Sequence, residues 1–336
     1  MSAENKRSMT RPGKIVLAIS LLVFSWWSVY TRYVDLAGFD LVTNQPWRQL
    51  SMHQYLDTLA GTRPFPYQWR VLAFWIVRAV EVLTKLDPHL IDVTLKTLTL
   101  TASALLLYLF SLTIVDAMGA LLTTAIYLLV TAAAFASEGY AIYFSNDYLL
   151  VAGWFAAVYA LRRRQWALAA LATFIAAWSK ETIVIVVILV ALEAWQRRAP
   201  WSAVVLCAAA FAVPTIVLRA MYEAPIQDWV WWHSVRLNVP FVVWSLPALE
   251  IVVRNNLKVF LFLNVLWLLA LRAWRRTTDP FLRSLGITLI CYLAMAWMVV
   301  YIRELRHSLP VTVLVLPLAV AEIEAFFAPA PLRNVV

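Results

Sequence analysis

The chain has 336 residues, of which 63% are hydrophobic and only 14% are charged, and its mean hydropathy is +0.75. This composition excludes a soluble globular protein, because soluble domains contain far more charged side chains. The formal net charge of +9 would indicate a nucleic-acid partner in a soluble chain, but in a membrane protein the Lys and Arg of cytoplasmic loops account for much of it. We therefore predict an all-α polytopic membrane protein that contacts membrane lipids and no nucleic acid.

The first apolar run covers 15–30 and follows a short basic segment. The basic residues are Lys6, Arg7, Arg11 and Lys14. A secretory signal peptide has the same polarity, but here no small-residue cleavage site follows and aromatic residues crowd the end of the run. We predict a cytoplasmic tail over 1–14 and an uncleaved first span over 15–34.

The segment 35–89 is a long polar interruption after the first span. Within it, 68–86 carries four charged residues that fall within about 80° of one another at helical spacing. They are Arg70, Arg78, Glu81 and Lys85. A helix with one charged stripe lies in a membrane interface more readily than it crosses the bilayer. We predict an outer loop over 35–89 with an interfacial amphipathic helix over 68–86.

Three purely basic clusters punctuate the later apolar runs, and each is expected on the cytoplasmic side. They are Arg162-Arg163-Arg164, then Arg197-Arg198, then Arg272 with Arg275 and Arg276. A single span between the first two clusters would put them on opposite sides of the membrane. Two short spans, 166–179 and 182–196, keep both clusters inside and leave Lys180-Glu181 at an outer turn, recessed into the membrane.

The same rule, extended along the chain, predicts about ten spans in a single domain over 1–336. They cover 15–34 and then, within 90–327, the segments 90–114, 117–135, 147–161, 166–179, 182–196, 200–220, 255–271, 284–302 and 308–327. A cytoplasmic tail over 328–336 follows. A topology with one more span, in which 68–86 crosses the membrane, would place the basic N-terminus outside. Compact loops and the absence of any Asn-x-Ser/Thr sequon are compatible with a bacterial inner membrane.

Three charged clusters of mixed sign fall at outer span ends in this topology. They are Asn146-Asp147, Lys180-Glu181 and the run Arg303-Glu304-Leu305-Arg306-His307. Ionisable groups at membrane depth are costly and usually mark a functional site. The alternative is that each cluster is a structural ion pair that fixes helix ends. Because all three face one compartment, we predict a shared polar cavity.

Several arginines and lysines beside carboxylates suit a phosphate-bearing lipid headgroup, since a guanidinium binds two phosphate oxygens at once. A nearby carboxylate would then serve as a general base. The four histidines show no metal-ligand spacing, and the chain contains no HExxH, GxxxxGK[ST], GxSxG or CxxC motif. Zinc, nucleotide-hydrolase and serine-hydrolase chemistry therefore have no support, and no cofactor is predicted.

The order of these parts resembles the GT-C superfamily of integral-membrane glycosyltransferases, which use polyprenyl-phosphate-linked sugars. The likeness extends over roughly 30–310. The motifs are Pro66-Tyr67-Gln68-Trp69-Arg70-Val71-Leu72, Asn146-Asp147-Tyr148, Lys180-Glu181-Thr182 and Arg303-Glu304-Leu305-Arg306-His307-Ser308-Leu309-Pro310. Many members carry adjacent acids after the first span, whereas this chain has the separated Asp35 and Asp40.

The resemblance implies a catalytic carboxylate and a binding site for the lipid phosphate on the outer side. Asp40 is the first choice for the base that deprotonates an acceptor hydroxyl, and Asp35 is the second. The residues implied in binding are Arg70, Asp147, Lys180, Glu181, Arg303, Glu304, Arg306 and His307. Metal dependence varies across the superfamily, and no metal ligand is singled out here.

The sequence thus favours a membrane glycosyltransferase that moves a sugar from a polyprenyl phosphate to a glycan, lipid or protein acceptor on the periplasmic side. Two alternatives stay open. One is a transporter or flippase of a lipid-linked or anionic substrate, although no internal repeat or matching pair of broken helices is visible. The other is a non-catalytic membrane protein with a GT-C-like fold.

Overall fold

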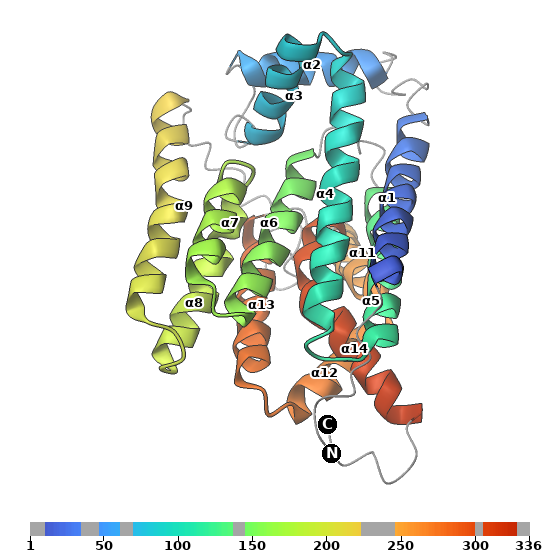
Figure 1. Ribbon diagram of the computed structural model, residues 1–336, viewed down its shortest axis with the longest axis vertical. Helices are drawn as coiled ribbons and strands as arrows, with labels where there is room; N and C mark the ends of the chain where they lie inside the picture. Colours follow the sequence, from blue (N-terminus) through green and yellow to red (C-terminus); the bar gives the residue numbers. More distant parts are fainter. Residues whose placement is uncertain are drawn as a thin grey trace.

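The computed structural model describes residues 11–34, 47–60, 70–136, 145–222, 246–299 and 305–327. Every regular element within these ranges is a helix. Figure 1 shows the long helices side by side in one bundle, with two short helices, α2 (Trp47–Leu59) and α3 (Leu72–Thr84), at one end. The described part of the chain is therefore all-helical, in agreement with the predicted all-α fold.

The remaining elements of the described ranges follow in chain order. They are α1 (Arg11–Val34), α4 (Pro88–Ser111), α5 (Ala117–Ala136), α6 (Ser145–Arg162), α7 (Trp166–Ala177), the 3₁₀ helix η5 (Glu181–Val184), α8 (Ile185–Trp195), α9 (Trp201–Met221), α11 (Leu246–Leu263), α12 (Val265–Arg276), α13 (Pro280–Val299), the 3₁₀ helix η7 (Leu305–Val311) and α14 (Thr312–Phe327). Packing is closest where α6 lies along α4 and α7, and where α12 lies along α14.

Four helices among the described residues are long and apolar enough to cross a membrane, which supports a membrane-embedded protein. They are Pro88–Ser111, Ala117–Phe135, Trp201–Met221 and Leu305–Phe327. The bent pair α11 and α12 would make a fifth span. The prediction of about ten spans is not confirmed by this criterion, because helices such as α7, with 12 residues, reach only ~18 Å at 1.5 Å per residue.

The predicted span over 255–271 is not one straight helix. The helix breaks at Asn264, whose φ of 47° lies in the left-handed region, and the two halves are bent by 69°. Asparagine adopts positive φ more readily than most residues, so this position accepts the break. The segment is therefore a kinked pair and not a straight span.

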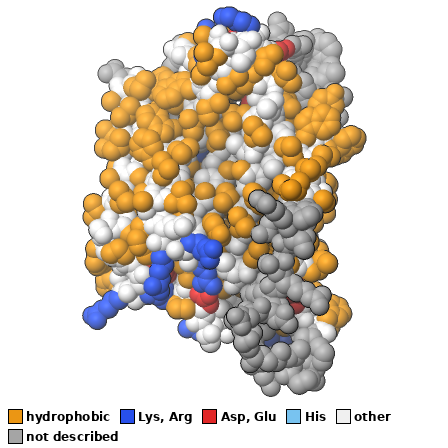
Figure 2. All heavy atoms as spheres, in the orientation of Figure 1, with side chains coloured by type: hydrophobic (Ala, Val, Ile, Leu, Met, Phe, Trp, Pro, Cys, Tyr) orange, Lys and Arg blue, Asp and Glu red, His pale blue; other side chains and the backbone are white. Residues whose placement is uncertain are grey.

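The two ends of the bundle differ from its middle in surface chemistry. Figure 2 shows Lys and Arg side chains gathered near the two ends of this face, with hydrophobic side chains over the band between them. The turns after α6, α8 and α12, which carry the arginine clusters, all lie at the end opposite α3 (Figure 1). We call this the basic end, and the opposite one the α3 end.

The predicted interfacial helix is shorter than the sequence indicates. Helix α3 has 13 residues, from Leu72 to Thr84, and buries Ala73 and Val77 while Arg78 is exposed and pairs with Glu81 at 2.9 Å. Arg70 precedes this helix and does not join its charged stripe, which corrects the predicted helix start at 68. A helix of this length reaches ~20 Å and is too short to cross a bilayer core of ~30 Å.

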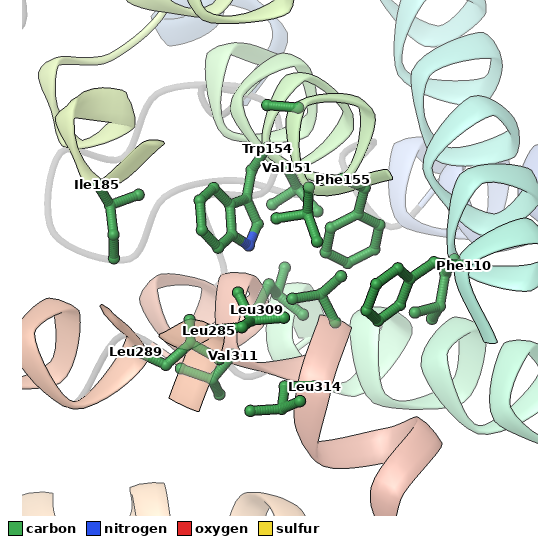
Figure 3. Close-up of a cluster of buried hydrophobic side chains, with 14 of the residues drawn as sticks. Phe110, Val151, Trp154, Phe155, Ile185, Leu285, Leu289, Leu309, Val311 and Leu314 are labelled. Carbon is green, nitrogen blue, oxygen red and sulfur yellow. The ribbon is translucent and has the colours of Figure 1, made fainter. Parts of the chain in front are cut away.

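An apolar core occupies the middle of the bundle (Figure 3). Trp154 and Phe155 of α6 point toward Leu309 of η7 and Leu285 of α13, and all four side chains are buried. The indole Nε1 of Trp154 donates a hydrogen bond to the carbonyl of Pro310 at 2.9 Å, which satisfies the one polar atom of this side chain. This core separates the α3 end from the basic end.

Gly153 lets α6 approach α7 closely. A Cβ atom added at Gly153 would lie 2.6 Å from the Cβ of Ala176, so Gly153→Ala is expected to push the two helices apart. We expect the free energy of unfolding to fall by about 1–3 kcal/mol, the usual cost of overpacking. Unfolding of the purified protein measures this, and the double variant Gly153→Ala/Ala176→Gly should regain most of the loss. A Gly153→Ala protein as stable as the parent would contradict the close approach.

Candidate functional site

A buried ion-pair cluster lies where α6 begins, toward the α3 end. Asp147, in the first turn of α6, accepts from Lys180 Nζ at 2.6 Å through one oxygen and contacts Arg306 Nε at 3.0 Å through the other. Asp147 is 5% exposed, Lys180 1% and Arg306 3%, so water does not screen their charges. One carboxylate thus neutralises only one of the two cations that it contacts.

His307 extends this cluster through Lys180. Its Nδ1 lies 3.1 Å from Lys180 Nζ, and its backbone carbonyl accepts a hydrogen bond from the Tyr292 hydroxyl at 2.7 Å. An ammonium group has no acceptor, so in this contact Lys180 Nζ donates to Nδ1 of His307. The tyrosine of α13 therefore holds η7 where Arg306 and His307 both reach the α6–α7 region.

The rim of the site consists of Arg70 and Glu181, joined by an ion pair of 3.2 Å. The Arg70 side chain is 13% exposed and that of Glu181 is 43% exposed. Exposure therefore rises from Asp147 through Arg70 to Glu181, and the site opens on this side. We call the six residues Arg70, Asp147, Lys180, Glu181, Arg306 and His307 the Asp147 cluster.

Three consecutive residues at the start of α6 connect this cluster to its surroundings. Ser145 donates a hydrogen bond to Asp92 of α4. Asn146 accepts from the backbone N–H of Ala73 at 3.1 Å through Oδ1 and donates to the carbonyl of Arg70 at 2.8 Å through Nδ2. Asp147 in turn binds Lys180, before η5, and Arg306 of η7. The three residues together therefore link the start of α6 to the start of α3, to α4 and to these two later segments.

The two hydrogen bonds of Asn146 hold the chain where it enters α3, so the loss of this side chain should affect the start of α3 most. Asn146→Ala leaves the buried N–H of Ala73 and the carbonyl of Arg70 without their partner. We expect a loss of about 1–3 kcal/mol in stability and faster amide exchange at Ala73 than in the parent. Hydrogen exchange read residue by residue measures this, with the Lys96 region of α4 as the internal reference. Unchanged exchange at Ala73 would show that the Asn146 tether does not operate.

A second polar cluster on α4 does not appear among the sequence-predicted residues. Asp92 pairs with Lys96 at 2.5 Å, and Lys96 is 4% exposed. Both lie inside the predicted span 90–114, one helical turn apart on the same face. Two ionisable residues within an apolar run are the signal that would have identified them. Ser145 places this pair next to the Asp147 cluster.

Six of the predicted site residues therefore come together, and four cannot be compared. The four are Asp35, Asp40, Arg303 and Glu304, which lie outside the described residues. Within the described ranges, no group of three or more His, Cys, Asp or Glu side chains is arranged to hold a metal ion.

The Asp147 cluster carries an excess of positive charge. It contains the three cations Arg70, Lys180 and Arg306 and two carboxylates, so one positive charge is in excess before His307 is counted. Guanidinium and ammonium donors at a partly open rim suit phosphate oxygens.

Comparisons of this chain with known protein families, with curated proteins and with solved structures found no match.

Proposed function

We propose that this protein is a membrane glycosyltransferase that moves a sugar from a polyprenyl-phosphate donor to an acceptor at the α3 end. The single observation that supports this most is the convergence of Arg70, Asp147, Lys180, Arg306 and His307 at the same end as α3. These residues belong to motifs far apart in the chain, in the order that resembles GT-C enzymes.

The proposed reaction is a single displacement with inversion. An acceptor hydroxyl attacks the anomeric carbon, the bond from that carbon to the phosphate oxygen breaks, and the electron pair leaves on the polyprenyl phosphate. The acceptor proton passes to a carboxylate, for which Asp40 is the first candidate and Asp35 the second. Arg70, with Lys180 and Arg306 behind it, stabilises the negative charge that grows on the departing phosphate.

Asp147 has a positioning role in this proposal. Its two oxygens are already occupied by Lys180 and Arg306, so it is a poor base and a good anchor for both cations. Glu181 does the same for Arg70 at the rim.

The proposed topology follows from the same arrangement. The basic end faces the cytoplasm by the positive-inside rule, and the α3 end faces the periplasm of a bacterial inner membrane. The short helices α7 and α8 then cross a locally thinned bilayer together with α1, α13 and the other long helices, giving about ten spans in a GT-C-like fold.

The test is consumption of a lipid-linked donor by the purified protein. A panel of radiolabelled polyprenyl-phosphate hexoses and pentoses is incubated with reconstituted protein and with native membranes that supply acceptors. We expect a labelled product and free polyprenyl phosphate, both lost in Asp40→Asn. Movement of intact donor across vesicles without product would instead indicate a flippase, and neither product nor movement across the panel would contradict the proposal.

A further inference from the structure

A cavity of about 490 Å³ lies at the basic end, far from the Asp147 cluster. It is bounded by the α6–α7 turn, the end of α8 and the start of α13, and its lining includes Arg162, Arg164, Trp166, Arg198 and Phe281. The proposed transferase does not use this cavity.

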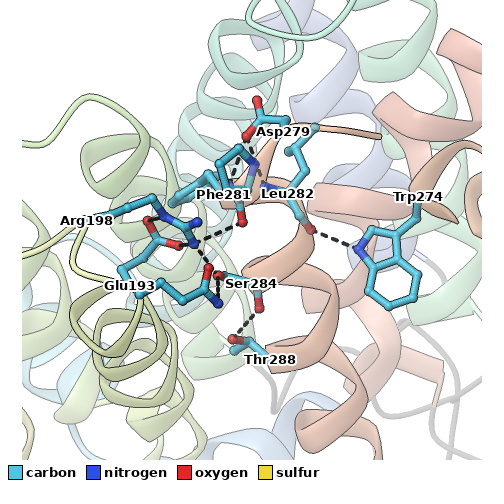
Figure 4. A network of polar contacts seen from close by, with 10 residues as sticks. Glu193, Arg198, Trp274, Asp279, Phe281, Leu282, Ser284 and Thr288 are labelled. Carbon is cyan, nitrogen blue, oxygen red and sulfur yellow. Dashed lines mark hydrogen bonds and ion pairs between the residues drawn. The ribbon is translucent and has the colours of Figure 1, made fainter. Parts of the chain in front are cut away.

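Ion pairs and hydrogen bonds that link α6, the end of α8 and the start of α13 build its wall, and Figure 4 shows those around Arg198. Arg162 of α6 pairs with Asp279 at 2.6 Å, just before α13. Arg198, after α8, binds both oxygens of Glu193 at 3.0 and 2.6 Å and also donates to Ser284 of α13 at 2.8 Å. These contacts hold the wall in place without a ligand, so an anion that enters does not have to order it.

Positive charge is in excess in this wall. Asp279 and Glu193 each already have an arginine, and no side-chain hydrogen bond or ion pair joins Arg164 to a described residue. The Nε and Nη1 groups of Arg162 and the Nη1 group of Arg198 also make no hydrogen bond within the described ranges. The cavity therefore combines free N–H donors with carboxylates that are already paired.

The backbone presents Arg164 in a fixed position. Its φ is 58°, and its N–H bonds to the carbonyl of Leu161 at 2.9 Å, which closes the end of α6. Arg197 stands at the corresponding place after α8, with φ of 57° and an N–H bond to Ala194 at 2.9 Å. Arg197 does not line the cavity, so it is a matched control for Arg164.

We propose that this cavity binds the phosphate headgroup of an anionic membrane phospholipid. Helix α7 starts at the cavity with Trp166 and exposes Leu168 and Leu171 on its outer surface, where acyl chains would lie. Tryptophan and arginine side chains at the edge of an apolar surface are typical of the membrane interface. A lipid headgroup at this level reaches the arginines while its chains stay in the bilayer.

The experiment titrates the full-length protein, in uncharged detergent, with short-chain phosphatidylglycerol and with phosphatidylcholine. We expect saturable binding of phosphatidylglycerol only, weakened about fivefold to tenfold in Arg164→Gln and unchanged in Arg197→Gln. Asp279→Asn removes a carboxylate from the wall and should tighten binding.

Three outcomes would overturn the site. Equal weakening in Arg164→Gln and Arg197→Gln would show that only overall charge attracts the lipid. Equal binding of phosphatidylcholine would exclude recognition of the anionic headgroup. Competition by millimolar inorganic phosphate as strong as that by the lipid would identify a soluble anion as the ligand. The Arg164 side chain is exposed and forms no hydrogen bond or ion pair with a described residue, so its variant is expected to fold normally.

Discussion

Replacement of Asp147 by asparagine is expected to lower the free energy of unfolding by about 3–5 kcal/mol, the usual cost of removing one partner from a buried ion pair. The variant keeps the shape of the side chain and removes the negative charge that the buried Lys180 and Arg306 both contact. Unfolding of the purified protein in mixed micelles measures the loss. Donor binding should fall as well, because both cations lose the group that positions them.

Two further variants make this prediction specific. The double variant Asp147→Asn/Lys180→Met removes one of the stranded cations and should be more stable than the sum of the single losses indicates. Arg78→Gln breaks an exposed pair at the same end, where the Arg78 side chain is 53% exposed, and should cost at most about 1 kcal/mol. Additive losses in the double variant would show that Asp147 and Lys180 do not interact in the folded protein.

Replacement of Arg70 by glutamine is expected to lower kcat/KM for a polyprenyl-phosphate sugar by about 10²–10³-fold, the effect of removing one donor to a developing anion. Arg70 is the most accessible cation of the Asp147 cluster, and its carboxylate partner Glu181 is half-exposed. Its loss should therefore cost activity and little stability. Kinetics with labelled donor, with unfolding measured in parallel, separate the two effects.

Arg70→Lys and Arg78→Gln are the controls for this experiment. Lysine keeps the charge but loses the bidentate geometry, so its activity should lie between those of the parent and Arg70→Gln. Arg78 lies on α3 and pairs with Glu81, so its loss removes the same charge from the same end without touching the cluster. Equal losses of activity in Arg70→Gln and Arg78→Gln would show that Arg70 has no specific role.

The basic end adds a pH dependence that does not involve the proposed reaction. Burial by itself raises the pKa of Asp279, but the hydrogen bond and charge of Arg162 outweigh it and hold the pKa below its ordinary value. A depressed pKa means that the Arg162–Asp279 pair stabilises the fold above the ordinary pKa of aspartate, and that this contribution is lost as the pH falls through the lower folded-state value.

Helix positions could be predicted closely from the sequence. The predicted spans 117–135 and 200–220 correspond to Ala117–Ala136 and Trp201–Met221. Long apolar runs bounded by charges leave the chain few alternatives, because backbone groups in an apolar environment must be satisfied within a helix. The bend at Asn264 could not be predicted, since no proline or glycine marks it.

The end of the bundle at which the Asp147 cluster lies could be predicted from the sequence, but the ion pairs within the cluster could not. The predicted topology placed Arg70, Asp147 and Lys180 on one side, because Asp147 and Lys180 lie at span ends facing away from the arginine loops and Arg70 lies in the outer loop on that side. It did not show that Asp147 would bind Lys180 and Arg306 at once. The predicted site also lacked Asp92 and Lys96, although two ionisable residues within the apolar run 90–114 were a signal for them.

The sequence by itself determined that this chain is all-helical and membrane-embedded, and which end of each helix carries charge. The hydropathy and charge of a segment depend only on residues that are neighbours in the sequence, so both can be read from the sequence without the tertiary structure. Only the tertiary structure decided which charges meet, because pairing depends on the rotation and approach of helices far apart in the chain. Gly153 brings α6 and α7 together, and Asp147 and Lys180, 33 residues apart, thereby become the buried pair at the centre of the candidate site.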